Sequence, residues 1–248
     1  MTLVLDGNEL LIRSVFIWRK NKKIPVNYFL LLQLFKYIKE FNPDEIYITA
    51  DGGSSWRKQI YPEYKANRKE FRESFPDINW ERVFRDYNKL LNDIQSFTPM
   101  YVVRVFSIEG DDVMSYLCRY LHKEVIVVSQ DKDIQQLAIL PKVKVYSTRQ
   151  KRFMEGPEVS NIVESKISTG DVSDNIPKAQ TVAESIRNQI LVDLINLPIS
   201  VDTKIKEYLD TIKKDKDNYS SFLKIYPYKR IEEVYNNIMK GEKINGSK

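Results

Sequence analysis

Three carboxylates fall within four residues in the segment Glu109-Gly110-Asp111-Asp112, between an apolar run and an apolar helical pattern. Ionised carboxylates held side by side repel one another, and a buried one is costly unless a cation or a hydrogen-bond donor compensates it. A bound divalent metal ion is one such compensation. The alternative is an acidic helix start exposed to water, which is common because negative charge is favourable near a helix N-terminus.

Carboxylates also follow four other short apolar runs. They are Asp6, Asp51, the pair Asp131 and Asp133, and the pair Asp171 and Asp174. Short runs rich in Val and Ile that alternate with helical patterns are typical of buried strands in a parallel sheet, where ligands bind at the carboxyl ends of the strands. Acids at several strand ends would meet in one crevice, so the sequence predicts a metal site.

The elements that position these acids can be predicted from the apolar periodicity. Strands are expected at Thr2–Asp6, Ile46–Ala50, Met100–Val105, Val125–Ser129 and Lys142–Ser147, with a hairpin from the last strand to Lys151–Phe153. Helices are expected from Leu10 to Val15, Val26 to Phe41, Phe71 to Phe97 with an interruption near Pro76, Val113 to Leu121, and Ile134 to Leu140. This order implies right-handed parallel crossovers and an α/β fold, with a central, mostly parallel sheet flanked by helices.

The segment from Asp51 to Lys69 interleaves basic and aromatic residues after a pair of glycines. It contains Arg57, Lys58, Tyr64, Lys65, Arg68 and Lys69. Cations that neutralise phosphates and rings that stack on bases are typical of a nucleic-acid surface, although charge runs also form solvated helix faces. The nucleic-acid interpretation is favoured because the segment follows Asp51 directly, and because Lys65 and Arg68 share one helical face.

The 248-residue chain has a net charge of +5 although its predicted site is acidic. This length suffices for one α/β core, or for a core with a small appendage. A basic exterior around an acidic pocket suits a polyanionic substrate, although composition alone also fits any soluble basic protein. The single cysteine, Cys118, fits a reducing cytosol. Without a signal peptide or a membrane-spanning stretch, the chain is expected to be cytoplasmic and to have no membrane partner.

Taken in order, these acidic motifs resemble those of the phage and bacterial 5′-nuclease family. The family includes flap endonucleases, 5′→3′ exonucleases, the nuclease domain of DNA polymerase I and phage ribonuclease H. The resemblance covers residues 2 to 177 and implies the PIN-like 5′-nuclease fold, with a helical arch inserted at about 52–86. It implies a nuclease core at 1–177 and a helical, DNA-binding C-terminal region at 178–248 that ends in a disordered tail from Lys240.

The resemblance also implies roles for individual residues. The acids that match those around a first metal ion are Asp6, Asp51, Glu109, Asp111 and Asp112. Those that match a second ion are Asp131, Asp133, Asp171 and Asp174. The residues expected to be catalytic are Lys65, Arg68, Asp112 and Asp131. Contacts to DNA are expected from Arg13, Arg57, Lys58, Tyr64, Lys65, Arg68, Lys69 and Lys178.

The activity implied by the resemblance is hydrolysis of phosphodiesters at or near 5′ ends of DNA, with RNA in RNA–DNA hybrids as a further candidate substrate. Two Mg²⁺ or Mn²⁺ ions would activate water and stabilise the leaving oxygen. The expected partners are DNA with a 5′ flap or a 5′ end, and replication proteins such as a single-strand binding protein. The protein is expected to be a monomer in a bacterial or phage-infected cytosol.

One segment departs from the family pattern, and two other functions stay open. Family members usually carry a glycine-rich hairpin after the Asp-Asn-Ile-Pro motif, whereas Lys178–Ala183 contains no glycine. A PIN-like single-strand endoribonuclease would need fewer carboxylates than this chain has. A non-catalytic nucleic-acid-binding protein would be expected to have lost some of them. A haloacid-type phosphatase is excluded, because Asn8 stands where that mechanism needs a second aspartate.

Overall fold

One mixed sheet organises the chain. The computed structural model describes residues 1–154, 161–212 and 218–239, so the tail predicted to be disordered lies outside the described residues. The strand order is β3-β2-β1-β4-β5-β6, with parallel pairing throughout except for the antiparallel β6. The strands are β1 (Thr2–Asp6), β2 (Glu45–Thr49), β3 (Tyr101–Val103), β4 (Val125–Ser129), β5 (Val143–Ser147) and β6 (Arg152–Phe153). The predicted α/β fold and hairpin are therefore confirmed.

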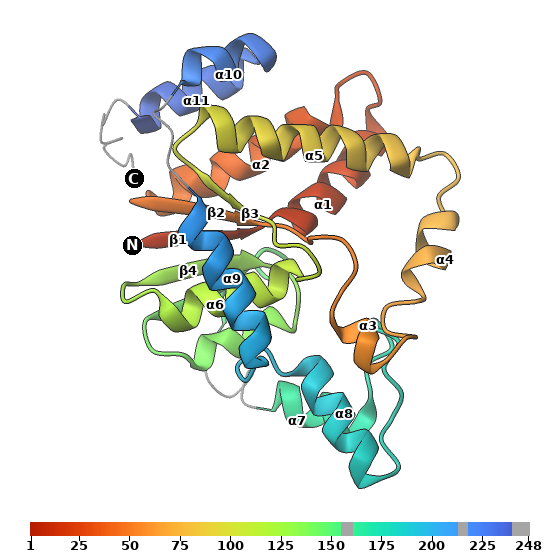
Figure 1. The fold of residues 1–248 in the computed structure, drawn as a ribbon. Coiled ribbons are helices and arrows are strands. Elements are labelled where there is room, and N and C mark those ends of the chain that lie inside the picture. The colour runs from red at the N-terminus through yellow and green to blue at the C-terminus, as the bar shows by residue number, and fades with distance from the viewer. Residues whose placement is uncertain (155–160, 213–217, 240–248) are drawn as a thin grey trace.

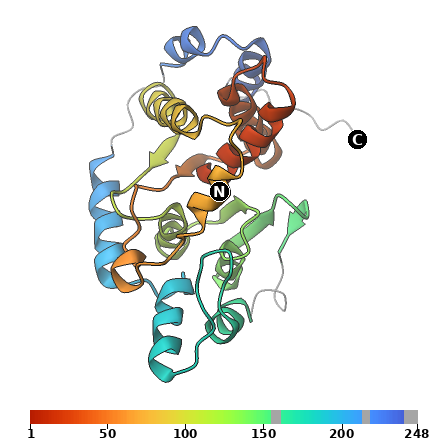
Figure 2. The same ribbon diagram turned by 90° about the vertical axis from the view of Figure 1, so that its right-hand side faces the viewer.

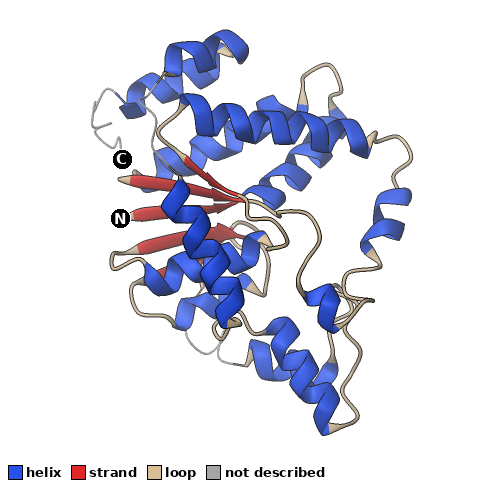
Figure 3. Ribbon diagram, in the orientation of Figure 1, coloured by secondary structure: helices blue, strands red, loops and turns tan. Residues whose placement is uncertain are grey.

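Helices cover both faces of this sheet (Figures 1 and 3). One face carries α1 (Gly7–Lys20), α2 (Val26–Phe41) and α5 (Trp80–Phe97), and the other carries α6 (Gly110–Tyr120), the 3₁₀ helix η1 (Ile134–Ile139) and α9 (Ile199–Thr211). Successive strand side chains point to opposite faces, so Leu3 and Leu5 pack in the first layer and Val4 in the second. All three are fully buried, as expected for a strand covered on both sides.

Several element boundaries differ from the prediction for local reasons. Helix α1 begins at Gly7, three residues early, because the Asp6 carboxylate caps it by accepting a hydrogen bond from Glu9 N at 2.9 Å. The predicted helix from Phe71 to Phe97 is divided, as expected, around Pro76. Its parts are α4 (Arg68–Glu73) and α5, which Asn79 caps. Residues 52–79, which precede α5, are called the arch segment and also contain α3 (Arg57–Ile60). The last residues of the expected arch, 80–86, belong to α5.

The C-terminal helices share the core of the sheet. Helix α9 packs on α6, while α10 (Tyr219–Ile225) and α11 (Lys229–Met239) lie over α5 and α2. Phe222 and Tyr235 belong to the same apolar cluster as Leu3. Helices α9, α10 and α11 of the region 178–248 therefore add to the core of the sheet. Across the three described ranges, no helix is both long enough and apolar enough to cross a membrane.

A helical hairpin lies beside the carboxyl ends of the strands. It consists of α7 (Ile162–Thr169) and α8 (Val182–Val192), and Figure 2 shows it below the arch segment when the strand ends face the viewer. Its small apolar cluster joins Leu191 and Val192 to Ile176 and to Tyr64 of the arch segment. The glycine-free loop before α8 ends in a capping box, in which Thr181 and Glu184 exchange hydrogen bonds. The hairpin thus connects the arch segment to the C-terminal helices.

Candidate metal centre

Most of the predicted acids lie at the carboxyl edge of the sheet. Asp6 ends β1, Asp51 follows β2, and Asp131 follows β4, while Asp111 lies in the first turn of α6. The chain adds β2 and β3 on one side of β1, and then adds β4 and β5 on the other side. The strand order therefore has a switch point between β1 and β4, which are parallel neighbours. Ligands of open α/β sheets bind at such a switch point. Local strand patterns therefore bring together acids that are far apart in the sequence.

Asp6 lies in the middle of this group. Besides Glu9 N, its carboxylate accepts a hydrogen bond from Ser129 Oγ at 3.0 Å. Burial, together with the charges of Glu9 and Asp131, raises the pKa of Asp6 to about 7. A carboxyl group in this state gains strongly from a nearby cation.

Asp111 is the least compensated acid of the group. Within the described ranges no side chain or backbone group donates a hydrogen bond to it, whereas Asp51 accepts one from Gly110 N at 2.9 Å. Loss of hydration raises the pKa of Asp111 well above its ordinary value, and repulsion from Asp131 and Asp6 raises it further, against the opposing charge of Lys65. The surroundings of Asp111 therefore fit a bound metal ion better than they fit a free carboxylate.

A second group of acids lies between the sheet and the α7–α8 hairpin. Asp133, Asp171 and Asp174 each have a carboxylate oxygen within 4.8 Å of the others. Burial and repulsion from Asp131 raise the pKa of Asp133 to about 6, although Lys166 opposes the rise. Carboxylate oxygens are the ligands that hard cations such as Mg²⁺ prefer. This group fits the predicted second ion.

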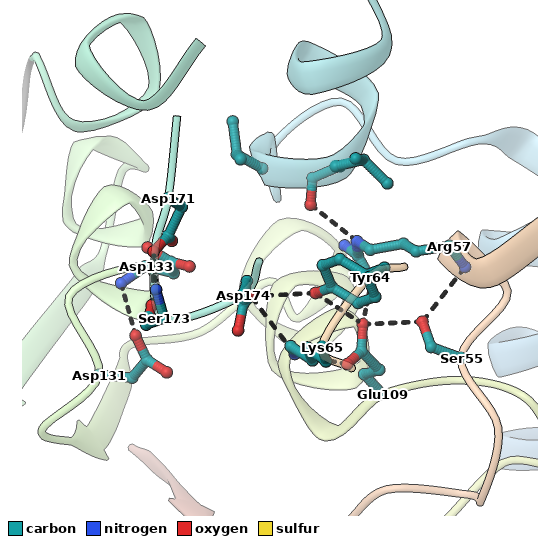
Figure 4. A network of polar contacts seen from close by, with 12 residues as sticks. Ser55, Arg57, Tyr64, Lys65, Glu109, Asp131, Asp133, Asp171, Ser173 and Asp174 are labelled. Atoms are coloured by element: carbon teal, nitrogen blue, oxygen red, sulfur yellow. Dashed lines mark hydrogen bonds and ion pairs between the residues drawn. The ribbon is translucent and has the colours of Figure 1, made fainter. Parts of the chain in front are cut away.

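Glu109 is surrounded by donors instead of by other acids (Figure 4). Lys65 Nζ lies 2.5 Å from one of its oxygens, and Arg57 Nη1 lies 2.7 Å from the other. Ser55 Oγ and the Tyr64 hydroxyl donate to the second oxygen as well, at 2.9 and 3.2 Å. Although burial raises the pKa of Glu109, the charges of Lys65 and Arg57 outweigh it and lower this pKa to about 2. Glu109 is therefore ionised and paired in this structure.

Arg57 and Asp112 form a buried ion pair behind the site, and both correct the sequence interpretation. The Arg57 side chain is 1% exposed and that of Asp112 is 0% exposed. The guanidinium group donates to both Asp112 oxygens, at 2.7 and 3.0 Å, and to Leu191 O at 2.8 Å. Trp56 Nε1 donates to Asp112 as well, at 2.9 Å. Arg57 thus has no exposed surface for DNA in this conformation, and Asp112 orients Arg57 rather than facing the open site.

The arch segment lies directly on the acids. The Tyr64 hydroxyl oxygen lies 3.1 Å from Asp174, so its single proton is shared between Asp174 and Glu109, and Arg68 pairs with Asp174 at 3.4 Å. Asn67 Nδ2 reaches the carbonyl oxygen of Val172 at 2.8 Å. Lys65, which has a left-handed φ of 57°, also contacts Asp174 at 3.6 Å. The predicted basic residues Lys65 and Arg68 are thus placed between the two acidic groups.

The other predicted DNA contacts are spread over the surrounding surface. Lys58, Lys69 and Lys178 are exposed. Arg13 is partly buried, where it donates to Glu9 and to the Tyr37 hydroxyl, both at 3.1 Å. The three exposed lysines lie outside the acidic groups and remain available to a polyanion approaching from outside, whereas Arg13 is held by Glu9.

Sequence reasoning missed two residues, Glu9 and Lys166. Glu9 is buried one helical turn after Asp6, where it accepts hydrogen bonds from Gln130 N and Thr148 Oγ1, both at 2.6 Å. Its spacing from Asp6 was a usable signal, because residues three apart share a helix face. Lys166 pairs with Asp133 and Asp171. Nothing in the local pattern of α7 indicates this contact, since Asp133 comes from another part of the chain.

The pKa values predict how the stability of the metal-free protein depends on pH. The folded state binds protons on Asp6 (pKa about 7) and Asp133 (about 6) more tightly than the unfolded chain, whose ordinary value is 3.8. The free energy of unfolding should therefore rise as the pH falls through 7 and 6. Glu109 acts oppositely: its contribution is present above its unfolded value of 4.5 and is lost as the pH falls toward about 2.

Thermal unfolding in EDTA should therefore show a higher Tm at about pH 5.5 than at about pH 8. Saturating Mg²⁺ should reverse this difference, because bound ions replace the protons and bind best when the acids are ionised. If the Tm in EDTA is lower at about pH 5.5 than at about pH 8, Asp6 and Asp133 are not held close to other carboxylates.

Comparison with known sequences gives a consistent set of relatives. Residues 1–164 match the family model described as the 5′-3′ exonuclease, N-terminal resolvase-like domain. DNA polymerase I of Caldicellulosiruptor bescii is 26% identical over 85% of this chain, and the match covers 26% of that protein. Ribonuclease H of Enterobacteria phage T4 is 28% identical over 57% of this chain and 48% of its own length. The 5′-3′ exonuclease of Mycoplasmopsis pulmonis is 26% identical over 76% of this chain and 65% of its own length. The chain thus spans less than two thirds of each.

Solved structures share the fold. The T5 5′-exonuclease with bound zinc superposes with a TM-score of 0.67 at 19% identity, over 86% of this chain and all of the other. The bacteriophage T5 flap endonuclease in complex with DNA and metal ions gives a TM-score of 0.66 at 19% identity, over 84% of this chain and 98% of the other. These likenesses show that the proteins share one fold.

Proposed function

The chain belongs to the 5′-3′ exonuclease family, and we propose that it is a metal-dependent 5′ nuclease that hydrolyses phosphodiesters at or near the 5′ ends of DNA. The observation that carries this proposal is the meeting of Asp6, Asp111 and Asp131 at one edge of the sheet. Repulsion among their carboxylates makes a bound cation favourable there. RNA in RNA–DNA hybrids is proposed as a second substrate, on the likeness to the T4 ribonuclease H.

The donor set indicates the kind of metal ion and the residues that would hold it. The residues proposed for the two ions all offer carboxylate oxygens, which suit Mg²⁺ or Mn²⁺. Among the described residues, those of Asp133, Asp171 and Asp174 lie within 4.8 Å of one another. When bound, two such ions would supply the positive charge that activates water and stabilises the leaving oxygen. The first ion is assigned to Asp6, Asp51, Glu109 and Asp111. The second is assigned to Asp131, Asp133, Asp171 and Asp174.

The chain's own cations have a separate task. Lys65 and Arg68 lie between the two acidic groups, where the scissile phosphate would be held. Their charges are fixed in place by the contacts of the arch segment to Asp174, so they can stabilise negative charge on the phosphate as it develops. Arg13, Lys58, Lys69 and Lys178 would neutralise phosphates further along the strand. Arg57, which Asp112 holds in place, would keep the Glu109 carboxylate in position.

Digestion of labelled substrates tests this function. The protein is incubated with 5′-labelled flap, nicked, blunt and RNA–DNA hybrid duplexes in Mg²⁺, with EDTA as the control. Products released from the 5′ end only in Mg²⁺ would support the proposal. Internal cleavage of single-stranded RNA alone would favour the endoribonuclease. Tight binding of DNA without any cleavage in Mg²⁺ or Mn²⁺ would favour the non-catalytic alternative.

Lys65→Ala should lower turnover by about a hundredfold while changing the Kd for substrate by less than about threefold. The charge is proposed to act on the transition state, and losing such a group costs turnover more than binding. Single-turnover cleavage and fluorescence anisotropy measure the two quantities. Lys39→Ala is the control, because Lys39 is exposed on α2 and belongs neither to the acidic groups nor to the proposed DNA contacts. Equal losses in binding and turnover would reduce Lys65 to a phosphate contact.

A further inference from the structure

Lys166 occupies a position that the nuclease assignment leaves unexplained. It lies on α7, and its ammonium group pairs with both Asp133 and Asp171, two of the three acids assigned to the second ion. The lysine side chain is 18% exposed, so the charge has largely left water. A lysine loses rotamer freedom and hydration when it is held in this way, and the two carboxylates provide the compensation.

The backbone around Lys166 fixes the acids on one side of this contact. Gly170 ends α7 with a φ of 79°, and a Cβ there would lie 2.5 Å from Ile176 O. Asp171 and Ile176 then exchange two backbone hydrogen bonds, at 2.7 and 2.8 Å. The loop that carries Asp171 is thus attached firmly to α7. Asp133 lies in the segment between β4 and η1, directly before η1, so Lys166 links the helical hairpin to the segment that follows β4.

A cation at this point relieves a specific repulsion. Oxygens of Asp133, Asp171 and Asp174 lie within 4.8 Å of one another, and such carboxylates cannot all be ionised without a nearby positive charge. Lys65 and Arg68 supply charge to Asp174 from the arch segment. Among the described residues, Lys166 is the cation paired with Asp133 and Asp171.

We propose that Lys166 is a built-in competitor of the second metal ion: its ammonium group takes the ion's place between Asp133 and Asp171, and it leaves when the ion binds. This inference rests on the proposed function, because it assumes that these carboxylates hold an ion. The lysine keeps the acids assembled in the metal-free protein and lowers their affinity for the ion. Binding of the ion then releases an ammonium group beside the centre, where it can meet a substrate phosphate.

Metal titration without nucleic acid tests the competition directly. Free Mn²⁺ is followed by electron paramagnetic resonance for the wild type, for Lys166→Met and for the control Lys132→Met. Lys132 lies between Asp131 and Asp133 in sequence, but it is exposed and forms no ion pair with a described residue. Its loss therefore removes one nearby charge and leaves Lys166 between Asp133 and Asp171. The Kd of the weaker Mn²⁺ site should fall about tenfold in Lys166→Met, while Lys132→Met should change it by less than about twofold.

Thermal unfolding in EDTA tests the other half of the inference. Lys166→Met should unfold at a lower temperature than Lys132→Met, because Asp133 and Asp171 lose their counter-ion. Lys166→Arg keeps a positive charge, so its Tm and its Mn²⁺ affinity should lie closer to those of the wild type than the values for Lys166→Met do. Addition of Mn²⁺ should raise the Tm of Lys166→Met more than that of the wild type.

The outcomes separate this inference from the proposed function. If the wild type and Lys132→Met bind Mn²⁺, and Lys166→Met binds it no more tightly, the competition is refuted while the nuclease assignment stands. If none of the variants binds Mn²⁺, both fail. If Lys166→Met is as stable in EDTA as Lys132→Met, the lysine does not hold the acids together and the inference is overturned.

Discussion

Asp111→Asn is expected to lower cleavage by about a thousandfold while leaving the metal-free protein at least as stable as the wild type. The change removes one anion and preserves the shape of the side chain. Asp111 accepts no hydrogen bond from any described residue, and it is repelled by Asp131 and Asp6, so its charge has no structural benefit without a metal ion. Stability and activity should therefore move in opposite directions at this position.

Single-turnover cleavage in Mg²⁺ and thermal unfolding in EDTA measure the two effects. Asp210→Asn is the control, since Asp210 is exposed on α9 and lies outside both acidic groups. It should leave cleavage and Tm unchanged. Turnover of Asp111→Asn close to that of the wild type would refute the assignment of the first ion. A clear loss of stability in EDTA would show that Asp111 has a structural partner.

Arg57→Met is expected to lower the free energy of unfolding by about 3–5 kcal/mol, because it leaves the fully buried Asp112 without its counter-ion and takes one of two cations from Glu109, which keeps Lys65. Arg57 pairs with Glu109 and Asp112 and donates to Leu191 O, so its loss affects the arch segment, α6 and α8 together. For a chain of this size, the loss corresponds to a Tm lower by about 6 to 20 °C. Methionine fills part of the space, so packing contributes less to the change than charge does.

Two variants identify the cause of this loss. Lys58→Met removes the neighbouring, exposed charge and should cost less than about 0.5 kcal/mol. The double variant Arg57→Met with Asp112→Asn should recover part of the loss, since it also removes the anion that has lost its counter-ion. Chemical denaturation of all four proteins in EDTA gives the comparison. A loss below about 1 kcal/mol for Arg57→Met would mean that water enters and compensates the two acids.

The sequence alone determined the sheet and the place of most acids. Strands covered on both faces must be apolar throughout, which makes them visible as Val- and Ile-rich runs such as Val125–Ser129. Parallel crossovers then force all their carboxyl ends to one edge. Asp6, Asp51 and Asp131 each follow such a run directly, so their meeting was decided by short-range pattern and by chain topology.

The roles of the cations were decided only by the tertiary structure. Arg57, Lys58, Lys65 and Arg68 look alike in the sequence, as basic residues in one polar segment. In the folded protein Arg57 is buried and Lys58 is exposed, because Arg57 meets the Leu191 carbonyl 134 residues further along the chain. Composition indicates that a charge is present, but the counter-ion and the burial that fix its role come from distant residues.

The same distinction applies to Asp112 and Lys166. Asp112 stands beside Asp111 in an acidic motif, yet a helix directs adjacent side chains about 100° apart, so Asp111 turns toward Asp6 and Asp131 and Asp112 toward Arg57. Lys166 meets Asp133 across 33 residues, because α7 lies beside the segment that joins β4 to η1. Periodicity fixes which element a residue belongs to. The packing of one element against another decides which charge it will face.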